Sequence, residues 1–314
     1  MKKNKILITG GAGFIGSNLV RRLLELNYKV VVIGREDIEK SSINNLKKGF
    51  EYFRIDLKKY KEIRKKLLKI NPNIIINLAG VNSQERDPTR VGNIFNDNFC
   101  PSLNLYNACL GLDALRCVIN MGSADEYGNN KVPFIETQKE QPISAYSLAK
   151  TSIKYLSDLY YQLYKLPVVV LRPFSVYGEY QKNHQFVAVV VGKCLRNESI
   201  DLTPGEQTRD FIYVQDLVSA MLSVINKPDA VIGETVNICT GKEIKIKEAA
   251  HLIKDLTKSK SKIRLGAIEY RKGDIMRYYG SYEKAKALLG WQPEFSYKQG
   301  LINTIKWQNS QLLK

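Results

Sequence analysis

The chain has 314 residues, 44% of them hydrophobic, which is enough for one large domain or two intimately joined ones and excludes a disordered tail. Five scattered cysteines without a Cys-x-x-Cys pair and only two histidines argue against a metal site or a disulfide framework and favour a reducing cytoplasm. The net charge of +17 comes from dispersed lysines, as in "LKKYKEIRKKLLKI", which favours an ordinary solvated surface over a nucleic-acid partner but would attract phosphate-bearing small ligands.

The first element is the short apolar run "ILI" near the N-terminus, which glycines interrupt too early for a signal peptide. No later stretch is long enough to span a bilayer, so we expect a soluble protein. Short β-branched runs then alternate with amphipathic helical segments such as 17–26 and 60–70. The predicted buried strands are 5–10, 29–34, 51–57, 74–80, 116–123 and 167–175. This alternation predicts an α/β protein with a Rossmann-type, doubly wound parallel sheet.

Beyond the segment "RPFSVYG" the pattern becomes irregular, with short elements separated by Gly and Pro turns. We interpret this part as a smaller C-terminal α/β domain. The larger domain, which contains the sheet, is predicted to comprise residues 1–174 plus about 206–240, and the smaller domain about 175–205 plus 241–314.

The first motif is "TGGAGFIG" at 9–16, between the first predicted strand and the first predicted helix. Gly10, Gly13 and Gly16 have the spacing that permits a tight turn, close approach of the backbone to a pyrophosphate, and packing of the helix on the sheet. The positive end of the helix then faces the phosphates. The motif predicts dinucleotide binding, with a plain strand-to-helix turn as the alternative.

The second motif pairs Tyr146 with Lys150 in "PISAYSLAKTSIKYLSDLY", where helical spacing places both side chains on one face. An ammonium beside a phenol favours the phenolate, so we expect a lowered Tyr146 pKa and a general acid/base role. Chance pairs are expected in a chain with 18 tyrosines. Ser123 in "NMGSADEYG" removes this ambiguity, because it follows a predicted strand at the edge where open α/β sheets bind ligands.

Together these segments resemble the extended branch of the short-chain dehydrogenase/reductase superfamily that acts on nucleotide sugars, the NAD-dependent epimerase/dehydratase family. "TGGAGFIGSNLVRRLLE" is similar to its cofactor fingerprint, "NMGSADEYG" to its active-site serine segment and "PISAYSLAK" to its Pro-x-Ser-x-Tyr-x-x-x-Lys motif. "LRPFSVYGEYQ", "TRDFIYVQDLVSAM" and "KAKALLGWQP" resemble later landmarks in the right order. The resemblance covers nearly the whole chain, and it implies that the larger domain binds the dinucleotide and the smaller domain the nucleotide sugar.

The resemblance implies that Tyr146 is the catalytic acid/base, that Lys150 holds the nicotinamide ribose and tunes the tyrosine, and that Ser123 hydrogen-bonds the reacting sugar oxygen. Asp56 is implied to contact the adenine and Asn98 to stabilise the active-site geometry. The alternative for Asp56 is that it only caps a helix, and the alternative for residues 78–80 is that they only form part of a buried strand. The implied cofactor-binding residues are Gly10, Gly13, Phe14, Ile15, Gly16, Arg35, Asp56, Leu57, Leu78, Ala79, Gly80, Asn98, Tyr146, Lys150 and Pro173.

On the substrate side, Arg209 and Arg271 resemble arginines that clamp a diphosphate, for which a forked guanidinium is suited. The loop 83–86 is implied to line the sugar pocket, with an ordinary surface charge as the alternative for Arg86. Ser175 departs from a frequent Arg-x-Phe-Asn pattern, which puts one substrate contact in doubt. The implied substrate-binding residues are Ser83, Arg86, Ser123, Asp125, Ser175, Arg209 and Arg271.

The residues after Ser123 bear on the reaction. Dehydratases of the family need a carboxylate where this chain has Ala124, whereas "GSADEYG" resembles the segment of NDP-4-keto-6-deoxyhexose reductases. We therefore predict reduction of a 4-keto sugar in deoxysugar, surface-polysaccharide or lipopolysaccharide biosynthesis. An NDP-hexose 4-epimerase with tightly bound NAD is the alternative reaction, and a 4,6-dehydratase is a weaker alternative. For Asp125, the non-catalytic alternative is that it only anchors its loop through local hydrogen bonds. A basic nucleic-acid-binding or scaffold protein is the non-enzyme alternative, but it would have no use for a tuned phenol.

The cofactor prediction depends on the end of the second strand. NAD-specific relatives usually place an aspartate there, whereas this chain has Gly34 followed by Arg35. A glycine would leave room for a 2'-phosphate and an arginine would pair with it, so we predict NADPH, with NAD as the alternative if Glu36 or Asp37 takes the ribose hydroxyls.

Relatives commonly dimerise through a four-helix bundle, so we also predict a homodimer. The corresponding segments are about 98–110 and 145–164. The apolar residues that we predict for the interface are Leu103, Tyr106, Leu156 and Leu159.

Overall fold

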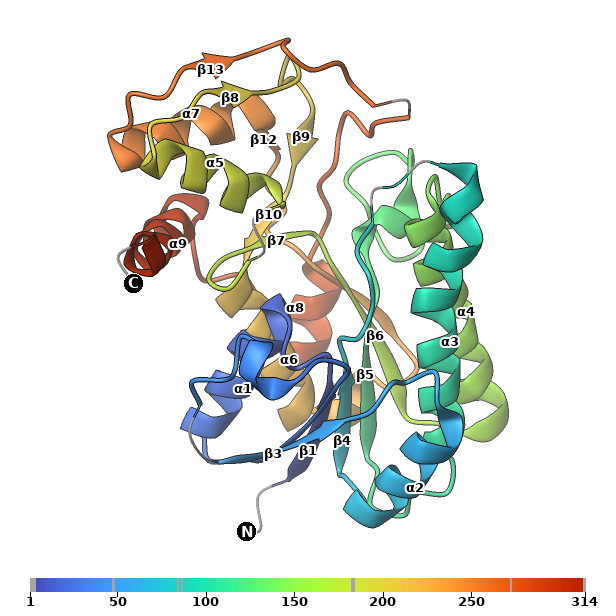
Figure 1. The fold of residues 1–314 in the computed structure, drawn as a ribbon. Coiled ribbons are helices and arrows are strands. Elements are labelled where there is room, and N and C mark those ends of the chain that lie inside the picture. Colours follow the sequence, from blue (N-terminus) through green and yellow to red (C-terminus); the bar gives the residue numbers. More distant parts are fainter. Residues whose placement is uncertain are drawn as a thin grey trace.

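A computed structural model describes residues 4–46, 49–83, 85, 87–181, 184–271 and 273–312 (Figure 1). Within these residues a seven-stranded sheet has the order β11-β6-β5-β4-β1-β2-β3, and every neighbouring pair is parallel. This confirms the predicted Rossmann-type fold. Its strands are β1 (Lys5–Thr9), β2 (Lys29–Gly34), β3 (Phe50–Arg54), β4 (Ile74–Asn77), β5 (Cys117–Met121), β6 (Val168–Pro173) and β11 (Thr235–Ile238).

Helices cover both faces of the sheet, because alternate strand residues point to opposite sides (Figure 1). Ile6 and Ile8 face one core, which includes residues of α1, α6 and α8, whereas Leu7 faces a second core with residues of α2, α3 and α4. These helices are α1 (Phe14–Glu25), α2 (Tyr60–Ile70), α3 (Val91–Cys109), α4 (Ala145–Tyr164), α6 (Val214–Asn226) and α8 (Glu283–Leu289).

One strand is less buried than the sequence predicts. The segment 51–57 reads as a fully buried strand, but β3 is the outer strand of the sheet and its residues are partly or fully exposed. The predicted strand is confirmed, but its predicted burial is wrong. The periodicity of a short apolar run does not reveal whether the strand lies at an edge of the sheet.

The upper lobe in Figure 1 has a core of its own, formed by α5 (Phe186–Leu195), α7 (Ile246–Thr257), α9 (Tyr297–Leu312) and neighbouring strands. The short strands pair as β7 (Ser175–Tyr177) with β10 (Phe211–Tyr213), β8 (Ile200–Asp201) with β13 (Ile263–Arg264), and β9 (Thr208–Arg209) with β12 (Ile244–Lys245). Further along the chain, Ala285, Leu289 and Trp291 belong to the first core beside the sheet. The division of the chain at about residue 240 stays a prediction, and we propose that α8 and Trp291 be grouped with the sheet.

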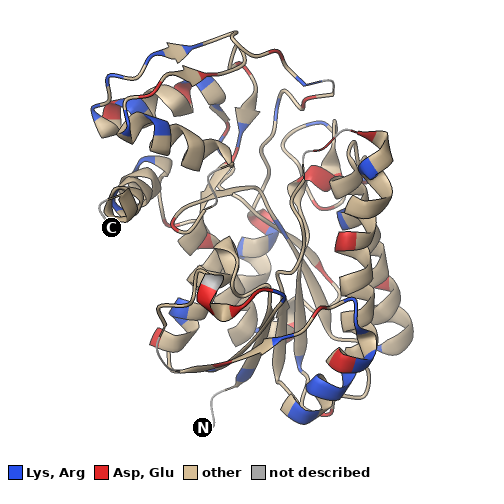
Figure 2. Ribbon diagram, viewed as in Figure 1, with Lys and Arg blue, Asp and Glu red and all other residues tan. Residues whose placement is uncertain are grey.

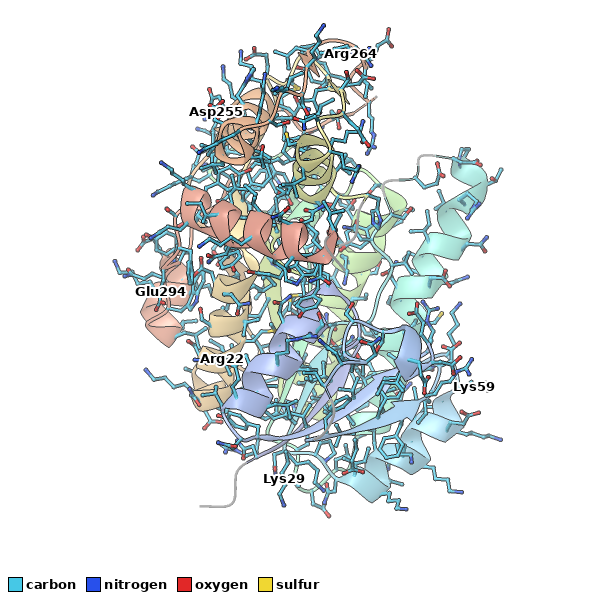
Figure 3. All side chains as sticks on the ribbon, turned by 60° about the vertical axis from the view of Figure 1, so that its left-hand side comes forward. Arg22, Lys29, Lys59, Asp255, Arg264 and Glu294 are labelled. Atoms are coloured by element: carbon cyan, nitrogen blue, oxygen red, sulfur yellow. The ribbon has the colours of Figure 1, made fainter. Side chains whose placement is uncertain are left out.

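Charged residues of both signs are distributed along the ribbon of both lobes (Figure 2). The six charged residues labelled in Figure 3 are all exposed and lie on the outside of the lobes. No helix in the described part of the chain is both long and apolar enough to cross a bilayer.

Candidate functional site

The glycine turn joins β1 to α1 through contacts that only glycines permit. Gly10 has a φ of +68°, and a Cβ there would lie 2.8 Å from the Leu78 carbonyl carbon at the end of β4. A Cβ on Gly16 would lie 2.4 Å from the Gly10 oxygen. Gly10 therefore lets the turn approach β4, and Gly16 lets α1 pack onto the turn.

The start of α1 suits a pyrophosphate. Gly13 is the N-cap, no side chain caps the helix, and the first turn contains no acidic residue. A Cβ on Gly13 would meet only the Gly10 oxygen, at 3.3 Å. Backbone N–H groups at an uncapped helix N-terminus bind phosphates, so the residues present fit a dinucleotide such as NAD.

A second cradle lies where β4 ends. A Cβ on Gly80 would lie 2.8 Å from Asn98 Oδ1 and 3.7 Å from Lys150 Nζ. Asn98 Oδ1 accepts the Val81 N–H at 2.9 Å, and its amide group donates to the Val81 and Ile94 carbonyls. Asn98 thus fixes the loop after β4 close to Lys150.

Ser123, Tyr146 and Lys150 come together at the carboxyl end of β5. Ser123 is the N-cap of the short 3-10 helix η3 (Ala124–Tyr127), and it shares a hydrogen bond with Tyr146 in the first turn of α4. Lys150 Nζ donates to the Met121 carbonyl at 2.7 Å and lies 5.7 Å from the centre of the Tyr146 ring. The structure therefore brings the three predicted residues into one cluster.

The electrostatics of this cluster differ from the prediction. Burial raises the pKa of Tyr146, as do the Asp125 and Glu126 carboxylates, and the hydrogen bond with Ser123 only partly opposes this rise. Burial lowers the pKa of Lys150 to about 8. The expected lowering of the Tyr146 pKa is thus wrong for the polypeptide by itself, because Lys150 donates to a backbone carbonyl while burial and two carboxylates act on the phenol.

Three further residues extend the cluster toward the upper lobe. The Tyr278 hydroxyl donates to Asp125 Oδ1 at 2.9 Å, and the Arg209 guanidinium lies 5.3 Å from the centre of the Tyr278 ring. Arg209 itself donates to the carbonyls of Thr208 and Ile275. Asp125 and Arg209, both predicted, therefore both contact Tyr278, which the sequence analysis missed.

The other predicted substrate residues are more distant or not described. Ser175 begins β7, where its N–H donates to the Asp210 carbonyl. Ser83 Oγ accepts the Glu85 N–H, and Arg271 lies exposed in a loop. Within the described ranges, no hydrogen bond or ion pair joins Ser83 or Arg271 to the cluster at Ser123. Arg86 lies outside the described residues.

The region after β2 corrects one step of the cofactor argument. A Cβ on Gly34 would lie 2.5 Å from the Tyr52 hydroxyl, which donates to the Glu36 carbonyl at 2.6 Å. The Cβ side of Gly34 is thus occupied by Tyr52, so the missing side chain at Gly34 does not by itself open space for a 2'-phosphate. Asp37 forms an ion pair with Arg54, and Arg35 is exposed.

The remaining predicted cofactor residues lie along the same edge of the sheet. Asp56 follows β3, and its Oδ1 accepts the Lys58 N–H at 2.9 Å, although it does not cap α2, whose N-cap is Lys59. Pro173 is buried at the end of β6. The other predicted cofactor residues follow the carboxyl ends of β1, β3 and β4. They are Phe14, Ile15, Leu57, Leu78 and Ala79.

The sequence analysis also missed a buried ion pair beside the cluster. Arg172 and Glu126 are both fully buried, 2.7 Å apart. The available signal was an arginine inside the apolar strand "PVVVLRP", since a charge in such a strand requires a partner.

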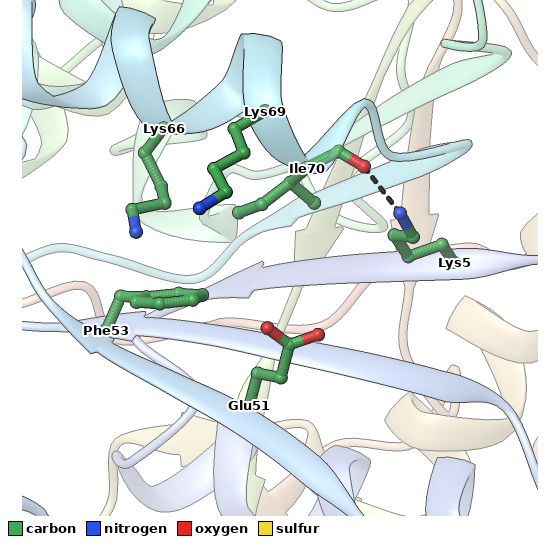
Figure 4. A pocket seen from close by; sticks show the side chains of 6 residues that line it. All are labelled: Lys5, Glu51, Phe53, Lys66, Lys69 and Ile70. Carbon is green, nitrogen blue, oxygen red and sulfur yellow. Dashed lines mark hydrogen bonds between the residues drawn. The ribbon is translucent and has the colours of Figure 1, made fainter.

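A separate cavity of about 330 Å³ lies at the opposite edge of the sheet (Figure 4). Lys5, at the first residue of β1, donates to the Ile70 carbonyl there, and Lys66 lies 3.6 Å from the centre of the Phe53 ring. Ligands of open α/β sheets bind at the carboxyl ends of the strands, so this cavity is not part of the candidate site.

Comparison with known proteins agrees with this geometry. The sequence profile of the NAD dependent epimerase/dehydratase family matches residues 6–239, well over half of the chain. The chain belongs to this family. It is therefore an enzyme of the extended short-chain dehydrogenase/reductase type, a nucleotide-sugar oxidoreductase of the epimerase/dehydratase kind.

Individual members of the family match over almost their full length. A putative UDP-glucose 4-epimerase of Methanocaldococcus jannaschii is 31% identical over 97% of this chain and 98% of its own. The structure of the Thermotoga maritima UDP-glucose 4-epimerase with UDP-glucose superimposes with a TM-score of 0.91 at 30% identity, covering 98% of this chain and 99% of that one. The Thermus thermophilus UDP-glucose 4-epimerase, solved in complex with NAD, gives a TM-score of 0.87 at 25% identity, covering 97% and 99%.

These relatives favour the 4-epimerase alternative over the 4-keto reductase that the sequence predicts. They are epimerases, and the cofactor in the Thermus structure is NAD. Similarity over the whole chain thus supports the epimerase alternative better than the reductase prediction drawn from the segment "GSADEYG".

Proposed function

We propose that this protein is an NDP-hexose 4-epimerase that works with bound NAD. The observation that carries the proposal is the cluster of Ser123, Tyr146 and Lys150 at the carboxyl edge of the sheet, on the same edge as the uncapped start of α1. Full-length similarity to UDP-glucose 4-epimerases supports UDP-glucose as the first substrate to test.

The mechanism assigns each group one task. Bound NAD would supply the hydride acceptor for the sugar C4 and, for inversion, the hydride donor to the opposite face of that carbon. Tyr146 removes the proton of the sugar 4-hydroxyl and later gives it back to the oxygen, and Ser123 hydrogen-bonds that oxygen. Lys150 holds the nicotinamide ribose, and Arg209 pairs with the substrate diphosphate.

A dehydratase would require an acid beside the serine to protonate the leaving hydroxyl. Ala124, at that position, has no group that transfers a proton. Asp125 is the next carboxylate, and it accepts a hydrogen bond from Tyr278. The residue set therefore favours epimerisation over dehydration.

A 4-keto reductase that uses NADPH is the second candidate, and Arg35 is the observation that favours it. Arg35 is exposed just after β2, and within the described part of the chain its guanidinium makes no hydrogen bond or ion pair that would prevent pairing with a 2'-phosphate. In a reductase, Arg35→Ala should weaken NADPH much more than NADH, and the loss should shrink as salt rises. Equal effects on both cofactors, measured by calorimetry, would support the epimerase.

The decisive experiment incubates the purified protein with UDP-glucose and no added cofactor. We expect copurified NAD and formation of the 4-epimer, followed by chromatography that separates the two epimers. Tyr146→Phe should keep the bound NAD and lower turnover roughly 10²- to 10⁴-fold, the usual contribution of a general acid/base. Reaction only with a 4-keto sugar and added NADPH would establish the reductase instead, and undiminished turnover in Tyr146→Phe would refute the assignment of the proton carrier.

We also propose a homodimer, with a corrected interface. Tyr106 and Leu156, predicted to lie in the interface, are buried within the subunit, and Tyr106 donates or accepts a hydrogen bond with Ser157. Exposed apolar side chains of α4 form the better candidate surface, next to stacked Phe95 and Phe99 of α3. They include Leu148, Tyr155, Leu159 and Leu163.

A further inference from the structure

Arg172 is a fully buried charge inside the central sheet. It lies on β6 between Leu171 and Pro173, and every residue of this strand is buried. An arginine in such a strand costs several kcal/mol unless carboxylates and hydrogen bonds compensate its charge. The partners that compensate this charge therefore show which segments Arg172 holds together.

Those partners come from two other segments. Arg172 Nε donates to Glu126 Oε2 at 2.8 Å, and its Nη2 forms ion pairs with Glu126 and with Glu140. Glu126 belongs to η3, the turn that begins at Ser123, and Glu140 precedes α4, where it accepts the Tyr155 hydroxyl at 2.8 Å. One guanidinium thus connects β6, the serine turn and the segment leading to Tyr146.

The second oxygen of Glu126 contacts the serine directly. Glu126 Oε1 accepts the Ser123 N–H at 2.7 Å, while Ser123 Oγ accepts the Asp125 N–H. A Cβ on Gly122 would lie 2.7 Å from Glu126 Oε1, so the preceding glycine makes room for the carboxylate. The contacts run without a gap from Arg172 through Glu126 to the serine.

We propose that the Arg172–Glu126 pair is the positioning element of the reaction centre: it fixes the Ser123 turn against β6 and keeps one negative charge beside Tyr146 and Lys150. This inference rests on the proposed roles of Ser123, Tyr146 and Lys150, and it holds for either candidate reaction. Neither member of the pair is a catalytic residue, because both are buried behind the serine.

The electrostatic part follows from the charges around the cluster. The Glu126 carboxylate raises the pKa of Tyr146 and also that of Lys150. Its own pKa is raised by burial, which Arg172, the Ser123 N–H and Lys150 oppose. The charged and titratable groups that face the pair Tyr146 and Lys150 are Asp125, Glu126 and Tyr278, and those that face Glu126 are Arg172, Lys150 and Tyr146.

The test removes the charge and keeps the shape. Glu126→Gln retains an oxygen that accepts the Ser123 N–H, but the neutral amide no longer raises the pKa of Tyr146. We expect the acid limb of the pH profile of kcat for UDP-glucose epimerisation to move to lower pH by about one unit, as Coulomb's law gives for one charge within ~10 Å at an effective dielectric constant of about 20. The KM for UDP-glucose should change much less than kcat.

Asp216→Asn is the matched control. Asp216 is also a buried carboxylate, which accepts the N–H groups of Glu294 and Phe295, far along the chain from the serine turn. Its loss should cost stability without moving the pH profile. A pH profile for Glu126→Gln that matches the wild type, or one that moves equally in Asp216→Asn, would overturn the electrostatic part of the inference.

Arg172→Lys tests whether the pair positions the serine turn, and it provides this test even if Glu126→Gln does not fold. An ammonium keeps the positive charge, but it cannot match the planar fork that joins Glu126 and Glu140. We expect a lower kcat with the acid limb unmoved, and an unchanged kcat would contradict positioning. Retained turnover in Tyr146→Phe would instead refute the proposed function, so the two failures are distinguishable.

A readout without turnover completes the test. Because the Glu126 charge raises the pKa of Lys150, Glu126→Gln should make Lys150 lose its proton at a lower pH. The rise of stability with pH that follows from this deprotonation should therefore begin earlier in Glu126→Gln than in the wild type, as followed by urea unfolding. An identical onset in both proteins would contradict the inference.

Discussion

Lys150 is a buried ammonium, and its removal should stabilise the fold while it abolishes activity. Burial lowers the Lys150 pKa from its usual 10.5 to about 8, which corresponds to about 3 kcal/mol spent on keeping the charge in the folded protein. Lys150→Met removes this cost but also a hydrogen bond to the Met121 carbonyl, worth about 1 kcal/mol. We therefore expect the variant to gain about 2 kcal/mol at pH 7.

The sign with pH is fixed by linkage. Between pH 8 and 10.5 the unfolded wild type keeps the Lys150 proton and the folded wild type loses it, so wild-type stability from this group rises with pH across that window. The advantage of Lys150→Met is thus full below pH 8 and should fall by about 3 kcal/mol as the pH approaches 10.5.

The assay is urea unfolding of both proteins at pH 7 and at intervals up to pH 10. Lys242→Met is the control, because Lys242 is exposed and its loss should change neither stability nor its pH dependence. The reasoning is refuted if Lys150→Met is no more stable than the wild type at pH 7, or if the difference between them stays constant up to pH 10.

Two further substitutions test the glycine turn and the subunit interface. Gly16→Ala places a Cβ 2.4 Å from the Gly10 oxygen, so we expect a loss of roughly 2 kcal/mol or more in stability together with weaker NAD binding by calorimetry, whereas Gly92→Ala, with nothing within 4 Å in α3, should be neutral or stabilising. Equal behaviour of both variants would contradict the close packing. Leu159→Lys on α4 should give monomers in light scattering at micromolar concentration, whereas Leu68→Lys, equally exposed on α2, should not, and an intact dimer in Leu159→Lys would refute the proposed interface.

The sequence by itself determined the fold and the local part of the site. A strand-to-helix turn has few solutions, so the spacing of Gly10, Gly13 and Gly16 predicts it from neighbouring residues alone. Helical geometry likewise places Tyr146 and Lys150 on one face, since four residues make about one turn. These predictions needed no knowledge of distant parts of the chain.

Contacts between segments far apart in the chain needed the tertiary structure. The Arg172 guanidinium meets Glu126 and Glu140 because β6 pairs beside β5, which no local pattern specifies. Tyr278 reaches Asp125 across 153 positions, and Tyr52 fills the space beside Gly34 from the neighbouring strand.

The protonation of Tyr146 shows the same division most clearly. Sequence spacing places an ammonium near the phenol and predicts a lowered pKa, but the result depends on every charge and on the water around the group. In the folded chain burial, Asp125 and Glu126 raise the pKa of Tyr146, and Lys150 is directed to the Met121 carbonyl. Residue identity is a property of the sequence, whereas burial is a sum over the packed chain, and only the tertiary structure decided it.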